Sequence, residues 1–514
     1  GNITQYTDTM GEDSVHRYYY SAWGTHLGSE GNSMFYADHF TQEGMLQLNY
    51  AHQIGEEGTK IAENVYDFSA NDENNVCAYL TSIGEGTDYL ALWLYDGTET
   101  KQIAERIQPL EDCYTLSSDG KYLIYLLDGE SGNYRLMVYD VEAGTSTEIA
   151  NGSLAAYDIS REDNTIYYVL DENNTYNFYA CLPDGVGKMI ASDIPFMQLM
   201  PNGKEVLYCK QSDSTVLYED LLYDDCPDDT SKDEVRALMT SDAGIKSILQ
   251  DCYLYTNGES KLLSESVISA AAMNSETSYA LCYIMDLSET SSKVPISQVS
   301  SEDDILYYYY AMAMQGTGLK LQILNNDGKA ISLFGNDISS NGVQISKDGS
   351  MVAYFDTDED GNQVLMCGEL KGITLKNVQT VAENVDNAIF LGNSNTLAYL
   401  YDYVNNTGAL GVYKDGKTTL LSDTVCHVAF ASDKDEMFFI QNADETTGNG
   451  ELMHYKNGTA THLDDNVFCI QYRNGGTAAY IKNYDQETQL GDLCYFDGSN
   501  TKEVDTQISA LFIE

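Results

Sequence analysis

One polar loop combines acidic side chains at a spacing that suits a hard metal ion. The run DTDEDG at 356–361 has the DxDxDG form. Alternate carboxylates in such a loop converge on the cation, and the glycine permits the sharp turn. The sequence departs from a complete EF-hand, because Cys367 stands where the bidentate glutamate belongs. We therefore weigh a calcium site at Asp356, Asp358 and Asp360 against a solvated hairpin between two strands, which is the default interpretation.

Histidines offer a second chemistry, since neighbouring strands can gather imidazoles around a transition metal. Four of the seven lie near the start of the chain, at His16, His26, His39 and His52. No catalytic motif accompanies them, because the chain has no GxSxG elbow, no HExxH helix and no phosphate-binding glycine loop. Strand-end histidines are the default interpretation. We expect a chain without catalysis more readily than an enzyme.

Aromatic side chains offer a third chemistry, which is stacking on sugar rings. The chain has 41 tyrosines and two tryptophans. Trp23 is followed closely by His26 at a predicted strand end, so we predict these two as ligand-binding residues. Trp93 and most tyrosines fall inside short apolar runs instead. Those positions predict packing between sheets.

The charge of the chain excludes several partners. It has 80 Asp and Glu against 27 Lys and Arg, for a formal net charge of −53. A nucleic-acid partner is excluded, because phosphate backbones are bound by replacing counterions with Lys and Arg. Anionic membrane surfaces are disfavoured for the same reason. The acidic surface would instead attract cations or basic peptides.

These residues lie in a chain that repeats itself. The clearest copy reads SDGKYLIY at 118–125 and continues, after a polar hairpin, as YRLMVYD at 134–140. Successive copies are about 40 to 45 residues apart, except for two longer intervals. The positions equivalent to the turn residue Asp119 are Glu73, Glu162, Asn202, Thr277, Asp348, Asn393, Asp433 and Asn474.

A period of this length with short Tyr- and Val-rich runs predicts an all-β fold, a β-propeller of four-stranded antiparallel blades. We predict one domain over 1–514, with eight to ten blades in one ring. The ring would be closed by the C-terminal strand Ile508 to Ile513 lying against Val15 to Ala22 and Met34 to Tyr36. Two smaller propellers in tandem are the alternative.

The two long intervals predict insertions, at about 220–250 and 286–304. The first contains the capping-box pattern SKDE at 231–234, followed by apolar residues at helical spacing up to Gly244. It predicts a short amphipathic helix. The second, Asp286 to Asp304, is rich in Ser and Glu and predicts a loop.

The runs SSDGK at 117–121 and SKDG at 346–349 resemble the SPDGK blade motif of TolB-like propellers, often called WD40-like repeats. Ser or Lys replaces the proline of that motif here. The resemblance covers nearly the whole chain. It implies a propeller that binds partners or serves as an interaction scaffold, sometimes exported and sometimes attached to an enzyme. It implies no catalytic residue.

We therefore expect a non-catalytic binding or scaffold propeller that recognises a protein, peptide or glycan. The alternative is a metal-assisted carbohydrate lyase or hydrolase with its site in the central channel. The longest apolar run, Ile305 to Met314, is too short to span a bilayer. We expect the extracellular part of a bacterial surface protein, whose signal or anchor preceded Gly1.

Overall fold

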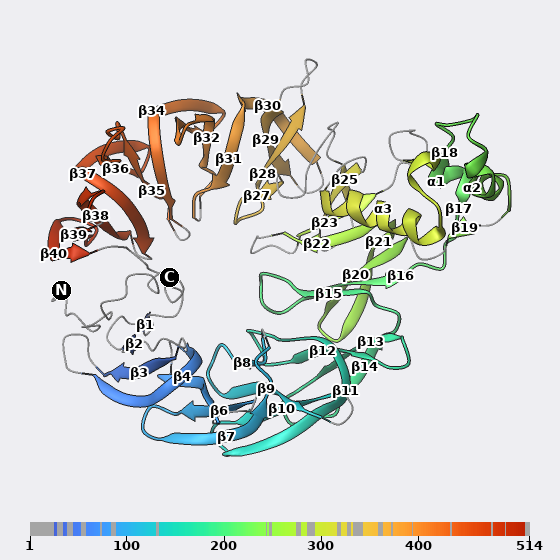
Figure 1. Cartoon of the computed structure of the whole chain (residues 1–514), viewed down its shortest axis with the longest axis horizontal. Coiled ribbons are helices and arrows are strands. Elements are labelled where there is room, and N and C mark those ends of the chain that lie inside the picture. Colours follow the sequence, from blue (N-terminus) through green and yellow to red (C-terminus); the bar gives the residue numbers. More distant parts are fainter. Residues whose placement is uncertain are drawn as a thin grey trace. The chain divides into compact units, whose positions relative to one another are not determined.

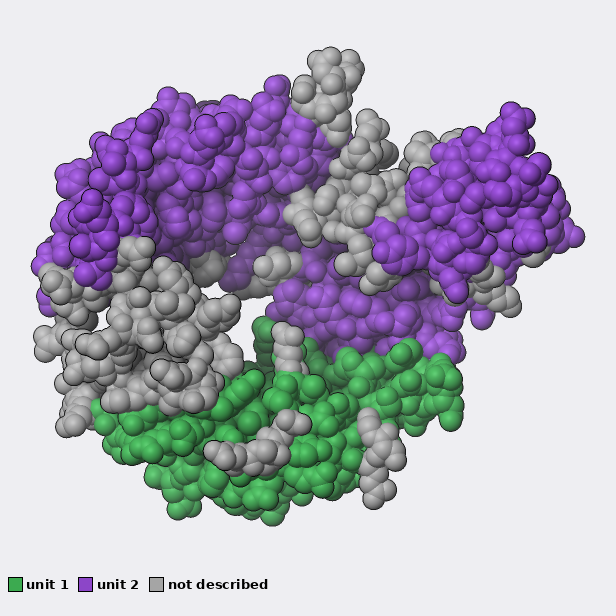
Figure 2. Space-filling model, viewed as in Figure 1, with its two compact units in different colours: residues 1–192, 512–514 green, residues 193–511 purple. Residues whose placement is uncertain are grey.

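The structure is a computed structural model, and it describes most of the chain. The described residues are 25–27, 34–38, 45–52, 58–71, 74–83, 89–110, 112–129, 133–242, 244–245, 249–273, 279–284, 293–315, 320–325, 330–332, 343–357, 363–371, 374–392, 394–431, 434–473, 476–488 and 490–508. The chain forms two compact units, one ending at Ser192 and the other beginning at Asp193 (Figures 1 and 2).

The first unit contains two antiparallel sheets of seven strands each. Their strands follow the chain order without a crossover. The first sheet contains β1 (Thr25–Leu27), β2 (Met34–Asp38), β3 (Leu46–Ala51), β4 (Thr59–Asn71), β5 (Val76–Ser82), β6 (Leu90–Tyr95) and β7 (Thr100–Ile107). The second contains β8 (Tyr114–Leu116), β9 (Tyr122–Asp128), β10 (Tyr134–Asp140), β11 (Thr145–Ile159), β12 (Ile166–Asp171), β13 (Tyr176–Cys181) and β14 (Lys188–Ala191).

The second unit contains three four-stranded sheets. Their strands are β15 (Phe196–Leu199), β16 (Val206–Gln211), β20 (Gln250–Thr256) and β21 (Glu259–Val267); then β22 (Ser269–Ala272), β23 (Tyr279–Ile284), β25 (Lys320–Asn325) and β26 (Ala330–Ser332); then β27 (Gln344–Ile345), β28 (Met351–Thr357), β29 (Gln363–Lys371) and β30 (Thr374–Glu383).

A ten-stranded sheet completes the second unit. It contains β31 (Val385–Phe390), β32 (Leu397–Val404), β33 (Thr407–Lys414), β34 (Lys417–Phe430), β35 (Glu436–Gln441), β36 (Gly450–Lys456), β37 (Thr459–Arg473), β38 (Thr477–Asp485), β39 (Leu490–Phe496) and β40 (Thr501–Ile508).

The large sheets are four-stranded sets joined end to end. Strand β4 pairs with β3 through residues 59–65 and with β5 through residues 65–71, with a register shift beside each. It is therefore the outer strand of one set and the inner strand of the next. Asn64 and Asn466, in β4 and β37, have φ of 56° and 57° at these hand-over points. Asparagine tolerates this left-handed conformation better than most residues.

The repeated tyrosines lie in the cores, as the sequence predicts. Tyr79, Tyr125, Tyr168, Tyr208, Tyr354, Tyr399 and Tyr480 are all at most 4% exposed. The cores lie between neighbouring sheets, because Leu123 and Tyr125 of β9 pack with β5 and β6, whereas Ile124 of the same strand packs with β12. Each sheet thus buries both faces. All eleven cysteines are free and most are buried, as expected of small apolar residues.

The SSDGK run forms a turn that joins successive sets in the first unit. The Asp119 carboxylate accepts hydrogen bonds from Ser117 Oγ at 2.8 Å, from Lys121 Nζ at 2.7 Å and from Asn164 Nδ2 at 3.0 Å. Asn71, at the end of β4, donates to the carbonyl oxygen of Ser117 at 3.2 Å. Partial burial alone would raise the pKa of Asp119, but these donors hold it well below its usual range.

The second predicted insertion is wrong in part, and the predicted ring closure stays a prediction. The second long interval is not a loop throughout, because the helix α3 (Glu302–Gln315) begins inside it and β24 (Val294–Pro295) precedes that helix. The predicted ring closure by Ile508 to Ile513 and Val15 to Ala22 falls almost wholly outside the described residues. Among the described helices, none is both long and apolar enough to cross a membrane.

We predict that Asp119→Ala destabilises the protein by about 1 to 3 kcal/mol at pH 7, since several donors lose a charged acceptor. The folded pKa of Asp119 is depressed, so its contribution is present above pH about 4 and is lost as the pH falls further. Urea unfolding of wild type and variant at pH 7 and pH 3 measures both effects. The exposed Asp184→Ala is the control, and an equal loss in both variants would contradict the role of the turn.

Candidate functional site

The structure describes only part of the predicted sites. Trp23 lies outside the described residues, and His26 is on β1 opposite Phe35. Asp356 is near the end of β28, opposite Val364, whereas Asp358 and Asp360 lie outside the described residues. Both sites therefore stay predictions. Within the described part of the chain, no group of three His, Cys, Asp or Glu side chains is arranged to hold a metal.

Two insertions in the second unit form one small body, the inserted subdomain. The first insertion, between β16 and β20, contains β17 (Val216–Leu217), α1 (Tyr218–Leu221), β18 (Leu222–Tyr223), a 3-10 turn (Thr230–Lys232), α2 (Asp233–Met239) and β19 (Gly244–Ile245). The second, between β23 and β25, contains β24, a 3-10 turn (Ile296–Gln298) and α3. Both leave their sheets at the same place, the connection between the second and third strands.

The two insertions are joined by strand pairing and by polar contacts. β18 and β24 run parallel, with Leu222 opposite Val294. The hydroxyl of Tyr309 on α3 donates to the carbonyl oxygen of Leu221 at 3.0 Å, and this bond is buried. The ammonium of Lys232 donates to the carbonyl oxygen of Val299, also at 3.0 Å. Neither insertion has its full set of partners without the other.

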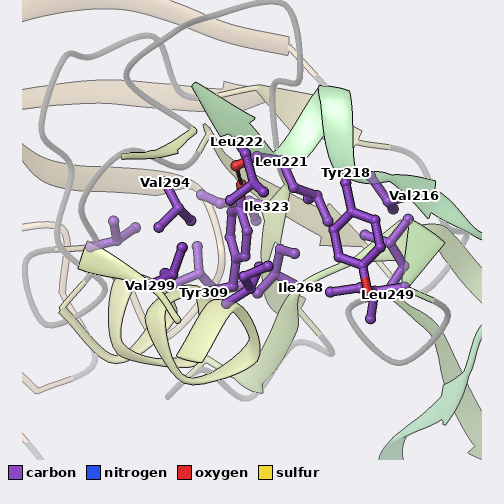
Figure 3. Close-up of a cluster of buried hydrophobic side chains, with 14 of the residues drawn as sticks. Val216, Tyr218, Leu221, Leu222, Leu249, Ile268, Val294, Val299, Tyr309 and Ile323 are labelled. Atoms are coloured by element: carbon purple, nitrogen blue, oxygen red, sulfur yellow. Dashed lines mark hydrogen bonds between the residues drawn. The ribbon is translucent and has the colours of Figure 1, made fainter. Parts of the chain in front are cut away.

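An apolar core fixes the subdomain to the sheets below it (Figure 3). Tyr309 is 2% exposed and Val294 is fully buried. Figure 3 shows side chains from both insertions meeting Ile268 and Ile323, which belong to the sheet region. Burying side chains of this size contributes about 1.5 to 3 kcal/mol each. The subdomain is therefore part of the second unit's core and not a loose loop.

The starts of the helices differ from prediction. The expected capping box at 231–234 does not form, because the N-cap residue of α2 is Lys232, whose side chain makes no capping bond. Asp229 instead caps the preceding 3-10 turn by accepting from Ser231 N at 2.9 Å. A capping box occurs instead at α3. Ser301 Oγ accepts from Asp304 N at 3.3 Å, and Asp304 Oδ2 accepts from Ser301 N at 3.0 Å. The pattern SEDD at 301–304 was the signal for the helix that sequence reasoning missed.

The surface of the inserted subdomain is acidic, because its cations are bonded to neighbouring groups and many of its carboxylates are exposed. Its three described cations are half-buried and already bonded within the subdomain: Arg236 bonds Asp224 at 2.7 Å, Lys232 bonds the carbonyl oxygen of Val299, and Lys293 Nζ bonds the carbonyl oxygen of Glu219 at 2.8 Å. Many carboxylates are exposed. They are Glu219, Asp224, Asp225, Asp228, Asp229, Asp233, Glu234, Asp303 and Asp304. Tyr307 on α3 is 74% exposed among them.

A second group of functional interest lies on inner strands of the first unit, and no motif marks it in the sequence. Asp67 Oδ2, on the inner part of β4, accepts from the hydroxyl of the buried Tyr114 at 3.0 Å. Burial raises the pKa of Asp67, although the hydrogen bond from Tyr114 opposes this. Burial also raises the pKa of Asp158 on β11, although a hydrogen bond from the backbone N–H of Ile159 opposes this. Carboxyl groups perturbed in this way occur at functional sites.

The comparisons with known proteins support the fold. No protein-family model matches the chain, and no curated protein matches it. Similar solved structures include the β-propeller domain of the Trilobed protease from Pyrococcus furiosus, at 14% identity over 70% of this chain and 95% of that chain, with a TM-score of 0.31. A eukaryotic initiation factor has 12% identity over 84% and 96% of the two chains, with a TM-score of 0.42.

A third similar structure is a prolyl endopeptidase, with 12% identity over 82% of this chain and 54% of that chain and a TM-score of 0.32. Identities of this size indicate fold alone. Our expectation that the chain is more readily non-catalytic is withdrawn, because two of these three structures come from peptidases; at these identities they assign no activity to this chain. With the recurring four-stranded antiparallel sheets, the comparisons show that this chain has a β-propeller fold.

For Asp67, we predict that Asp67→Asn stabilises the protein at pH 7 and has little effect at pH 4. A carboxyl group whose pKa is higher in the folded than in the unfolded state destabilises the protein when the pH rises above the unfolded pKa of about 4. The amide oxygen of asparagine still accepts from Tyr114 but carries no charge. Thermal unfolding at both pH values measures the difference, with the exposed Asp184→Asn as control. If the melting temperatures of the wild type and the variant differ by the same amount at both pH values, the argument from burial of Asp67 is contradicted.

For the acidic loop, we predict that calcium raises the melting temperature of the protein and that Asp358→Ala abolishes the rise. The matched control is Glu359→Ala, which removes a carboxylate between the alternating ligand positions and should retain the response. A melting curve that calcium leaves unchanged would remove the calcium site.

Proposed function

We propose that this chain is a binding or scaffold propeller of the TolB-like type, in the extracellular part of a bacterial surface protein. Its ligand is a protein, peptide or glycan, and the inserted subdomain is the surface that recognises it. The TolB-like resemblance supports the class and the location. The inserted subdomain supports the choice of surface.

The observation that carries this proposal is that the propeller sheets do not need the insertions. The β15–β21 and β22–β26 sheets each have their four strands without them. Ordering the chain of both insertions costs conformational entropy, on the order of 1 kcal/mol or more per residue. An ordered insertion on an otherwise complete scaffold is where proteins commonly place recognition.

The charge of the subdomain favours a basic protein segment over a neutral glycan. Its described cations are already bonded within the subdomain, so its surface offers exposed carboxylates and, one turn after Asp303 on α3, the exposed ring of Tyr307. Arginine and lysine side chains pair with carboxylates and also lie over aromatic rings. A cationic peptide would thus use both kinds of group.

The test neutralises three exposed carboxylates that have no internal role, in the variant Asp228→Asn, Glu234→Gln, Asp303→Asn. Binding to arrays of lysine- and arginine-rich peptides and of glycans is measured at low and moderate salt. We expect at least fivefold weaker peptide binding, and binding that falls as salt rises.

The control removes the same charge from exposed positions outside the subdomain, in Asp415→Asn, Glu445→Gln, Glu487→Gln. It should change binding less than twofold. Equal losses in the two triple variants would show general electrostatic attraction and contradict a site on the subdomain. The absence of any peptide or glycan ligand would contradict the proposed function.

A further inference from the structure

A row of large side chains crosses the last set of strands in the first unit and ends at an open edge. Tyr168 on β12 lies opposite Tyr179 on β13, and Tyr179 lies opposite Met189 on β14. The two tyrosine rings stack at 5.2 Å with an interplanar angle of 8°. Tyr168 is 3% exposed, whereas Met189 is 56% exposed. Among the described strands, β14 pairs with β13 alone. The row therefore stops where a further strand would continue it.

Equivalent rows in other sheets mostly end in polar residues. The row through Trp93 ends at Gln102, and the row through Cys494 ends at Glu503. Polar and charged residues on an outer strand discourage pairing with a further strand. Two rows end in exposed leucines instead, the row through Tyr399 at Leu420, 56% exposed, and the row through Tyr208 at Leu262, 40% exposed. Their hairpins are the polar turns Asp415-Gly416 and Asn257-Gly258.

The hairpin beside β14 is apolar instead. Leu182 is 54% exposed and Val186 is 92% exposed, so three large apolar side chains, with Met189, lie on one hairpin and its edge strand. The hairpin lies close against Tyr168, since a Cβ added at Gly187 would lie 1.7 Å from the hydroxyl oxygen of that tyrosine. Exposed apolar groups gathered in this way mark interaction surfaces.

We propose that the free edge of β14 binds an extended segment of a cationic partner protein by strand addition. The main chain of the segment would pair with β14, and alternate apolar side chains would lie against Met189 and the Leu182–Val186 hairpin. This edge belongs to the first unit, whereas the inserted subdomain belongs to the second.

The charge of the chain selects this occupant. A second copy of the chain would bring another net charge of −53 to the same edge, so self-pairing is opposed at ordinary salt. A segment with lysine or arginine beside its apolar residues is attracted by the same field. The free main-chain groups of the edge require an extended polypeptide and not a helix or a sugar.

The test uses the full chain and a short fluorescein-labelled peptide in which valine and threonine alternate between flanking lysines. Fluorescence anisotropy should show binding. The double variant Val186→Ser, Met189→Ser should weaken it more than tenfold, because both apolar contacts are lost without a change of charge. These positions are exposed, so folding should be preserved and can be checked by the melting temperature.

Two controls separate strand addition from other outcomes. Leu420→Ser removes an equally exposed apolar residue at the equivalent position of another sheet and should leave binding unchanged. A peptide N-methylated on every amide of its valine and threonine stretch keeps its charge but has no N–H donor on either edge, so it cannot form the ladder with β14 and should not bind. Binding of the methylated peptide, equal loss in Leu420→Ser, no binding by wild type, or light scattering that shows a dimer disrupted by the double variant would each overturn the proposal.

Discussion

Each four-stranded sheet of this chain has two apolar faces and can cover neither by itself. Adjacent residues on one strand, such as Leu123 and Ile124, belong to cores on opposite sides of the sheet. Stability therefore depends on neighbouring sheets being held face to face. The hand-over strands do this covalently, because β4 and β37 leave one set and enter the next within a single strand. The Asp119 turn does it by hydrogen bonds at the connection between strands.

The same constraint explains why the interior was the predictable part. A side chain that must face a neighbouring sheet recurs in every set, so the tyrosines at Tyr79, Tyr125 and Tyr480 repeat with the period of the blades. Burial on both faces leaves little choice of residue type. The strand cores, the tyrosine positions and the presence of two insertions were therefore accessible from the sequence.

What could not be predicted depends on contacts between distant segments. The residues around Tyr309 gave no helical period, because α3 is held by a hydrogen bond to α1 and by apolar contacts with the first insertion and the sheets, and not by one amphipathic face. The capping box at Ser301 was a local signal for this helix, but the segment is rich in Ser and Glu and was therefore interpreted as a loop. Asp67 carries no motif at all. Its environment arises from Tyr114 on a strand of the neighbouring sheet, which only the packing of the two sheets reveals.

The inserted subdomain shows how a repeat fold accepts new surface without interrupting any strand of its sheets. Both insertions replace the connection between the second and third strands, where the chain only has to turn, so no face-covering residue is displaced. A single insertion there would have exposed its own apolar side. Two insertions from consecutive sheets cover each other, through the β18–β24 pair and the Tyr309 hydrogen bond. Because their core continues into the sheets at Ile268 and Ile323, movement of one insertion must disturb the other and the sheets beneath. Any ligand that prefers one arrangement of the subdomain thereby acts on the second unit as well.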